Sequence, residues 1–251
     1  LRKKLPYTFC AMLIGTLAIT GVGFPLSYDL FHYSVGFSGF ISKDAIIEGT
    51  YAAQSSSGFF AFWALTLSAL FTSFYSWRLI FMTFYGNFRG KADHFSKAHE
   101  PETTMLLPLL LLSIGSIFSG MIFFSLFVGD ETKGFFNDAL LTTSTNNILY
   151  DYHYVPTWVK LSPFIAMLAG LGLAFNFYVI NLNLGKKLSN QHFGLYKFLY
   201  NKWYFDELFD LIIVKPALRC GDYLWKWGDG RLVDGFINRL SLGVIPKLTS
   251  F

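Results

Sequence analysis

The sequence has few charged residues and only two cysteines. Asp, Glu, Lys and Arg make up 14% of its 251 residues, whereas a soluble domain usually carries about 25%. Cys10 and Cys220 lie far apart, so we expect neither a disulfide framework nor a cysteine-based metal site. The formal net charge is only +4 and the basic residues form no dense cluster, which argues against nucleic acid as a partner.

Motifs that bind cofactors or activate nucleophiles are also missing. The sequence has no P-loop, no dinucleotide glycine motif, no nucleophile triad and no haem or iron–sulfur ligand set. His94 and His99 occupy a polar loop without metal-ligand spacing. We therefore expect no redox centre and no metal site in this chain. Leu1-Arg2-Lys3-Lys4 lacks the layout of a signal peptide, and we interpret the chain as the C-terminal part of a longer protein.

Apolar and aromatic residues are abundant instead. Hydrophobic residues make up 53% of the chain, aromatic residues 20%, and phenylalanine alone occurs 29 times. Apolar runs at 6–26, 59–85, 105–128 and 161–182 are each long enough to cross a bilayer. The sequence therefore predicts an all-α fold, a polytopic transmembrane helix bundle with one discontinuous helix, followed by a long amphipathic lateral helix.

The distribution of lysine and arginine predicts the topology. Basic residues concentrate at 2–4, 89–97 and 186–202, which marks these segments as cytoplasmic, whereas loop 129–160 is placed on the opposite side. This alternation leaves no full crossing for residues 27–58. The stretch is either a re-entrant piece or the second half of a broken helix, and such breaks commonly line cavities and form ion sites. We predict a broken helix over 6–53, an antiporter-like membrane part over 1–184, and a connector with the lateral helix over 185–251.

Lys43 is the first candidate for a functional residue. It lies in Gly39-Phe40-Ile41-Ser42-Lys43-Asp44, with apolar residues on both sides. A charge at membrane depth costs roughly 3 kcal/mol or more unless something pairs or hydrates it. A lysine that can gain and lose a proton there suits a proton relay. The alternative is a lysine at a helix end whose ammonium snorkels to the surface.

Three neighbouring ionisable residues are weaker candidates. Asp44 points about 100° away from Lys43 on a helix, so it is a possible relay or hydration site rather than an obvious partner. For Asp44 and Glu48 the simpler interpretation is capping or interface anchoring, and we favour it for Glu48. His32 is either a loop-surface residue or the entrance of a proton path.

The chain changes character after Trp203. Apolar residues recur at helical spacing and face a polar side that is too rich in charge to span a bilayer. The pattern predicts an amphipathic helix lying along a membrane surface or along neighbouring helices, with bends possible at Pro216 and Gly228. Its polar face begins with Asp206, Glu207 and Asp210. We predict that the interface of this helix is formed by Asp206, Asp210, Asp222, Asp229 and Asp234.

Several motifs together resemble the C-terminal half of the antiporter-like L subunit of respiratory complex I, called subunit 5 in mitochondria. The segments that carry the resemblance are Leu1-Arg2-Lys3-Lys4-Leu5-Pro6, Gly39-Phe40-Ile41-Ser42-Lys43-Asp44, Tyr75-Ser76-Trp77-Arg78, His99-Glu100-Pro101 and Asn201-Lys202-Trp203-Tyr204-Phe205-Asp206-Glu207-Leu208-Phe209-Asp210. The likeness covers nearly the whole chain. One departure is Ser27–Val35, which looks inserted between the helix break and the lysine motif.

The resemblance implies a role in proton translocation. Lys43 would be the lysine of the half-channel that connects to the periplasm, and the first half-channel would precede this sequence. The chain would act as a subunit of NADH:ubiquinone reductase (H⁺-translocating), while FMN, iron–sulfur clusters and quinone belong to other subunits. The implied partners are other membrane-arm subunits, especially the adjacent antiporter-like subunit along the lateral helix, and the lipid bilayer. The implied location is the bacterial inner membrane, or the mitochondrial inner membrane for an organellar protein.

Two other functions fit parts of the sequence. A cation/proton antiporter subunit of the Mrp type shares the lysine motif, but such proteins often lack or shorten the long amphipathic tail. A membrane scaffold without transport would predict that removing Lys43 leaves proton pumping intact, while assembly depends on residues 203–245.

Overall fold

The chain is helical and divides into two compact units. The computed structural model describes residues 1–88, 90, 92–129, 131–140 and 146–249. The protein is 82% helical, and no strand occurs among these residues, so the predicted all-α class is confirmed. The units are Leu1–Leu184 and Gly185–Phe251, and each is described by itself. Arg89 and Lys91 of the predicted basic loop lie outside the described residues, as does part of loop 129–160.

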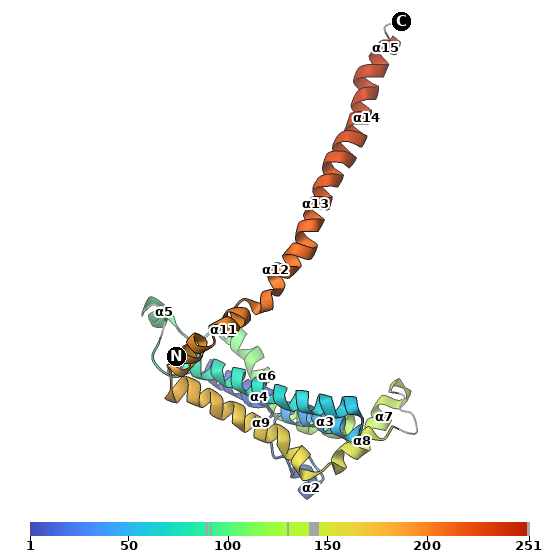
Figure 1. The fold of residues 1–251 in the computed structure, drawn as a ribbon. Helices are drawn as coiled ribbons and strands as arrows, with labels where there is room; N and C mark the ends of the chain where they lie inside the picture. The colour runs from blue at the N-terminus through green and yellow to red at the C-terminus, as the bar shows by residue number, and fades with distance from the viewer. Residues whose placement is uncertain (89, 91, 130, 141–145, 250–251) are drawn as a thin grey trace. The chain divides into compact units, whose positions relative to one another are not determined.

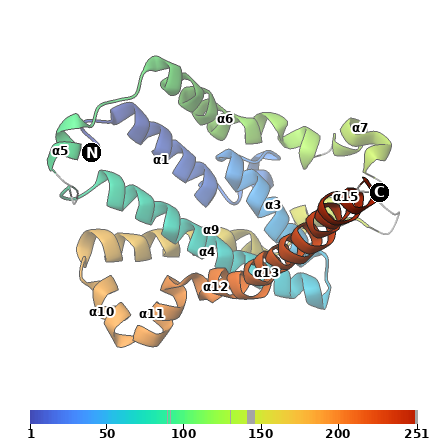
Figure 2. The ribbon, with the colours of Figure 1, turned by 90° about the horizontal axis from the view of Figure 1, so that it is seen from above.

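Three long apolar helices form the frame of the first unit. They are α4 (Ser56–Phe84), α6 (Thr103–Phe127) and α9 (Thr157–Phe175), which continues as a π-helical turn over Asn176–Ile180. All three are long and apolar enough to span a membrane, as the hydropathy pattern predicts. Figure 1 shows these three helices, and in Figure 2 α6, α1, α4 and α9 follow one another across the unit.

The first apolar run does not form a full span. We expected it to extend over 6–26, but helix α1 covers only Pro6–Thr20. The helix ends because Gly21 adopts the left-handed conformation, with φ of 75°, and glycine enters this conformation without steric penalty. The chain continues in a second short helix, α3 (Ser38–Ala52), which starts beside the last turn of α1. The predicted segment 6–53 thus contains two short helices separated by a break.

The inserted segment loops out of this break. The Val22 carbonyl accepts a hydrogen bond of 3.0 Å from the Phe37 amide, and the Val35 carbonyl accepts one of 2.9 Å from the Phe24 amide. Together with the antiparallel bridge between Gly23 and Gly36, these bonds close the loop at its base. The short helix α2 (Ser27–Phe31) lies within the loop. The two half-helices can therefore meet although 17 residues separate them in sequence.

Ser38 fixes the start of α3 against the middle of α6. Its Oγ lies 3.0 Å from the carbonyl oxygens of Gly115 and Ser116 and 2.9 Å from Ser119 Oγ. The same Oγ accepts a hydrogen bond of 3.0 Å from the Gly120 amide. Leaving any of these polar groups without a hydrogen bond away from water would be costly. The contacts therefore hold the half-helix in one position.

Short elements cover the two ends of the first unit. The helix α5 (Ala92–Lys97) lies at the end where α1 begins, since Lys4 Nζ donates to the Phe95 carbonyl at 2.5 Å. The opposite end carries α7 (Thr132–Phe136), a 3-10 turn over Asn137–Ala139, α8 (Ile148–Asp151) and a 3-10 turn over Tyr152–Tyr154. The end of α3 packs against the last two of these elements.

Glu100 joins the connection between α5 and α6 to the start of α1. Its Oε1 accepts hydrogen bonds from the amides of Tyr7 at 2.7 Å and Thr8 at 3.3 Å, and its Oε2 accepts one from Thr8 Oγ1 at 2.7 Å. A carboxylate at this position satisfies free amides and complements the positive end of the helix dipole.

Removing this cap is expected to destabilise the membrane unit. We expect Glu100→Ala to lower the free energy of unfolding by about 1–2 kcal/mol, the usual effect of losing a helix cap. Thermal denaturation of the purified complex measures the change. The matched control is Glu102→Ala, because Glu102 precedes α6 without a side-chain capping bond. Equal shifts for both variants would contradict the capping role.

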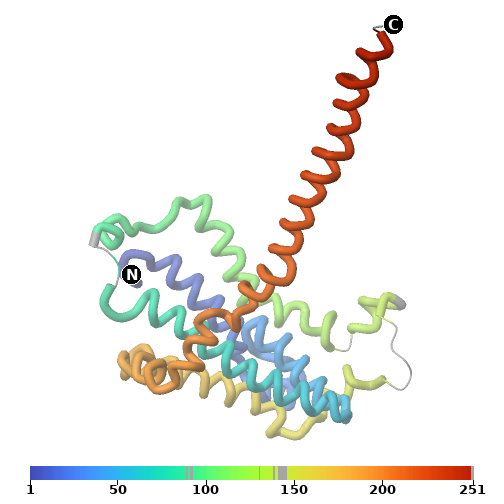
Figure 3. The backbone as a smooth tube through the Cα atoms, turned by 45° about the horizontal axis from the view of Figure 1, so that its top comes forward, coloured from blue at the N-terminus to red at the C-terminus, as the bar shows by residue number. Residues whose placement is uncertain are grey.

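The second unit consists of two short helices and one long helix. The short helices are α10 (Leu184–Gln191) and α11 (Phe193–Tyr200). After a kink in which Trp203 and Tyr204 have positive φ, helical geometry runs from Phe205 to Thr249, and Figure 3 shows this run as continuous. Its successive parts are α12 (Phe205–Phe209), η5 (Asp210–Val214), α13 (Lys215–Tyr223), η6 (Leu224–Asp234), α14 (Gly235–Asn238), η7 (Arg239–Val244) and α15 (Ile245–Thr249).

Neither predicted bend interrupts the long helix. The π-helical turn η5 ends two residues before Pro216, and η6 includes Gly228. Proline lacks the amide for a regular helical bond and clashes with the preceding turn, and a wider π turn accommodates such a local mismatch. At 1.5 Å per residue the run is about 65 Å long.

Candidate functional site

Lys43 lies at the break between the two half-helices. Its Nζ donates a hydrogen bond of 2.6 Å to the carbonyl of Thr20, the last residue of α1. The last carbonyls of a helix have no partner within the helix and carry the negative end of its dipole. The break between the two short helices thus supplies the Lys43 ammonium group with a hydrogen-bond acceptor, the Thr20 carbonyl, among apolar helices.

Gly21 makes room for this contact. A Cβ atom at Gly21 would lie 2.8 Å from Lys43 Cε and closer still to Nζ. Its positive φ also ends α1 and turns the chain away. The same glycine therefore creates the free carbonyl and leaves space for the lysine that binds it.

Asp44 points into a different environment from its neighbour Lys43. It is only 6% exposed and lines a small cavity of about 30 Å³ between α2, α3, α6 and α9. Its Oδ1 has no hydrogen-bond partner among the described residues. A water molecule needs roughly 10–15 Å³, so the cavity can hold water against this oxygen. Consecutive residues on a helix are offset by about 100°, and this offset predicts that the side chains of Asp44 and Lys43 point in different directions.

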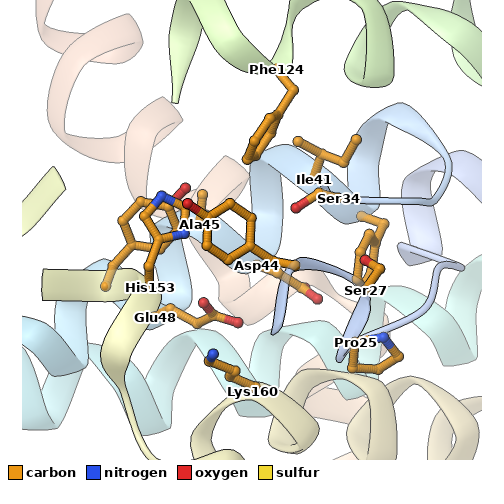
Figure 4. Close-up of a pocket in the computed structure, with 13 residues that line it drawn as sticks. Pro25, Ser27, Ser34, Ile41, Asp44, Ala45, Glu48, Phe124, His153 and Lys160 are labelled. Atoms are coloured by element: carbon orange, nitrogen blue, oxygen red, sulfur yellow. The ribbon is translucent and has the colours of Figure 1, made fainter. Parts of the chain in front are cut away.

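Two further charged residues line the cavity, and a third pairs with one of them. Glu48 follows Asp44 by one helical turn and is 8% exposed. Lys160 enters from the first turn of α9, and its Nζ lies 2.5 Å from Asp29 Oδ1 of α2. Figure 4 shows the ends of Glu48 and Lys160 facing each other across the cavity. The result is a cluster of three carboxyl groups and one ammonium group.

The other predicted site residues lie elsewhere. His32 is exposed at the end of α2, where it has a positive φ of 50° and its ring contacts Tyr28. It is not among the residues that line the cavity. Within the part of the chain that is described, no group of three or more His, Cys, Asp or Glu side chains could hold a metal ion.

The acidic residues of the long helix belong to the second unit, and all but the half-buried Asp210 are exposed. Asp206 lies 3.0 Å from Lys202 Nζ, and Asp210 lies 2.9 Å from Lys215 Nζ. The hydrogen bond and the charge of Asp206 raise the pKa of Lys202. Asp222, Asp229 and Asp234 are also exposed. Exposed pairs of this kind contribute little to stability, so these residues remain available to a partner.

Sequence reasoning missed Lys160 and Asp29, and it treated Glu48 as an anchor. A signal for Lys160 was present, because the lysine follows Trp158 and Val159 and immediately precedes the apolar run from Leu161. We assigned it to the end of the polar loop, whereas α9 already begins at Thr157. Nothing in the sequence indicated Asp29, whose importance depends on where the inserted loop folds.

Comparisons with known proteins point to one family. The family model described as "NADH dehydrogenase subunit 5 C-terminus" matches residues 75–145. NADH-quinone oxidoreductase subunit L of Rhodobacter capsulatus is 42% identical, over 99% of this chain and 42% of the relative. The subunit L of Rickettsia bellii is 37% identical, over 94% of this chain and 34% of the relative. NADH-ubiquinone oxidoreductase chain 5 of Phytophthora infestans is 37% identical, over 93% of this chain and 34% of the relative.

The chain thus spans about two fifths of the length of the first of these relatives and a third of the others. Its apolar helices make it a membrane-embedded protein. The similarity extends through the broken helix with Lys43 to the second unit, since it covers nearly the whole chain. The chain belongs to the family of NADH-quinone oxidoreductase subunit L and NADH-ubiquinone oxidoreductase chain 5, of which it is a C-terminal part.

Proposed function

We propose that this chain is a proton-translocating part of the membrane arm of NADH:quinone oxidoreductase. NADH oxidation and quinone reduction take place in other subunits, which hold FMN, the iron–sulfur clusters and quinone. The chain moves protons when charges along the membrane arm change. It works in the bacterial inner membrane, or in the mitochondrial inner membrane if the protein is organellar.

The observation that carries the proposal is the position of Lys43. Its ammonium group binds the free carbonyl of Thr20 at the break of an apolar helix, and the next residue, Asp44, lines a cavity that can hold water. Broken helices in membranes commonly place ion sites at their free ends. Lys43 accepts a proton from the interior of the membrane arm and releases it towards the side of Asp44.

The long helix of the second unit serves as the contact to other subunits. Its apolar side chains are exposed along the whole run from Phe205 to Thr249, which is unfavourable in water and suits burial against a partner or lipid. The partner is the adjacent antiporter-like subunit, and the helix acts as a clamp. The exposed acidic residues, including Asp222 and Asp229, line the polar side of this contact.

Removing the Lys43 ammonium tests the proposal. We expect Lys43→Met to reduce NADH-driven proton pumping close to background, because the variant loses the ammonium group that binds the Thr20 carbonyl at the break. Proton uptake into inverted membrane vesicles measures the effect, with assembly of the complex checked on native gels. Lys3→Met is the matched control, since Lys3 is exposed before α1. An assembled Lys43→Met complex that pumps like wild type would contradict the relay role.

A further inference from the structure

Three charged side chains beyond Lys43 line one cavity, and a fourth pairs with one of them. Asp44 and Glu48 come from α3, Asp29 from α2, and Lys160 from α9. Three of them are less than 10% exposed, although buried charges are costly unless they are paired. The proton path through Lys43 does not by itself account for this cluster.

Glu48 is the residue on which the other three act. Lys160 faces it across the cavity and pairs with Asp29, and Asp44 lies on its own helix. Carboxylates oppose the ionisation of a nearby carboxyl group, and an ammonium group favours it. Asp44 and Glu48 are four residues apart and so lie on the same face of α3. A proton on Asp44 therefore has a second carboxylate within one helical turn, across a space that can hold water.

Lys160 is held between two competing carboxylates. Its side chain is only 8% exposed and pairs with Asp29, whose side chain is 42% exposed. Asp29 thus connects the buried cluster with the surface of the unit. If the pair served only to fasten the inserted loop to α9, nothing would require Glu48 and the unpartnered Oδ1 of Asp44 to face the same cavity.

We infer that Glu48 carries the proton from Asp44 outward, and that Lys160, held by Asp29, is a positioning residue that controls when Glu48 releases it. This inference rests on the proposed translocation through Lys43. The proton reaches the Asp44 carboxylate, passes through cavity water to the Glu48 carboxylate, and leaves to the outer solvent beside Asp29. Lys160 keeps its own proton throughout, and each carboxyl returns to its ionised form.

The two members of the pair are expected to act in opposite directions. Without Lys160, Glu48 faces only carboxylates and holds its proton more tightly. Without Asp29, the Lys160 ammonium is free to compensate Glu48, which then releases its proton more easily. A pair that merely fastens the loop would give the same defect when either member is removed.

The pH dependence of pumping separates these cases. The charged and titratable groups around Glu48 are Asp44 on α3, Tyr28 and Asp29 on α2, Tyr152 and His153 after α8, and Lys160 on α9. We expect the pH profile of pumping to move to higher pH in Lys160→Met and to lower pH in Asp29→Asn. Pumping into inverted vesicles is measured with the whole complex while the lumen pH is varied, because the lumen corresponds to the outer side.

Two further variants complete the test. Glu48→Gln is expected to reduce pumping about tenfold, while Lys160→Arg keeps the charge and restores the wild-type profile. Asp151→Asn is the matched control for Asp29→Asn, because Asp151 is exposed on α8 at the same end of the unit. Its profile is expected to match wild type.

Distinct results overturn the inference and the proposed function. If Lys43→Met abolishes pumping but Glu48→Gln pumps like wild type, the outward role of Glu48 is wrong and the role of Lys43 stands. If Asp29→Asn assembles and its profile does not move to lower pH, Lys160 is only a structural fastener. If Lys43→Met itself pumps normally, the proposed function is wrong.

Discussion

Replacing Gly21 with alanine is expected to lower NADH-driven proton pumping by roughly tenfold or more in a complex that still assembles. A Cβ atom there meets only the end of the Lys43 side chain within 3.0 Å, so the lysine moves and the helices stay in place. The left-handed conformation adds a penalty of about 1–2 kcal/mol for a residue other than glycine. A displacement of about 1 Å in a reacting group can reduce a rate a hundredfold, and here Lys43 loses the Thr20 carbonyl.

Gly15→Ala provides the matched control for this variant. Gly15 lies in the same half-helix, but a Cβ atom there meets nothing within 4 Å. Alanine is also favoured over glycine within a helix by about 1 kcal/mol. Vesicles with Gly15→Ala are therefore expected to pump at the wild-type rate. Equal pumping by the two variants would mean that the contact between Lys43 and the end of α1 has no functional role.

Replacing Gly170 with leucine is expected to prevent stable assembly. Gly170 of α9 is buried against α4, where a Cβ atom would lie 2.7 Å from Ser73 Cβ and 3.0 Å from the Phe74 amide nitrogen. Two of its three close neighbours are backbone atoms of α4, so only a separation of the helices can make room. Overpacking of this kind typically costs about 1–3 kcal/mol and sometimes more. The separation also breaks the hydrogen bond of 2.7 Å from Ser73 Oγ to the Met167 carbonyl.

The same substitution two residues further along is the control. Gly172 is exposed, and a Cβ atom there meets nothing within 4 Å, so Gly172→Leu places its side chain outside the bundle. Native gels and thermal denaturation of the purified complex compare the two. Because α9 carries Lys160, any Gly170→Leu complex that does assemble should also show a disturbed pH profile. Normal stability of Gly170→Leu would mean that α4 and α9 do not pack as closely as described.

The membrane class and the long spans were predictable from the pattern of apolar and basic residues. Runs of more than 20 apolar residues and the asymmetry of lysine and arginine are properties of the linear chain. The unusual cost of a charge among apolar residues also singled out Lys43. The local backbone was harder to predict, because the first apolar run continues to Leu26 in sequence but its helix stops at Thr20. The left-handed conformation of Gly21, rather than hydropathy, ends that helix.

The cavity and its charged cluster depend on the tertiary structure alone. Lys160 and Asp29 are 131 residues apart, and they meet because the inserted loop closes on itself at Gly23 and Gly36 and turns α2 towards α9. The amino-acid sequence shows which residues are costly to bury, but it does not show which of them meet at the same cavity in the fold. Lys43 could thus be recognised from its neighbours in sequence, whereas the role inferred for Glu48 required the packing of four helices around one cavity.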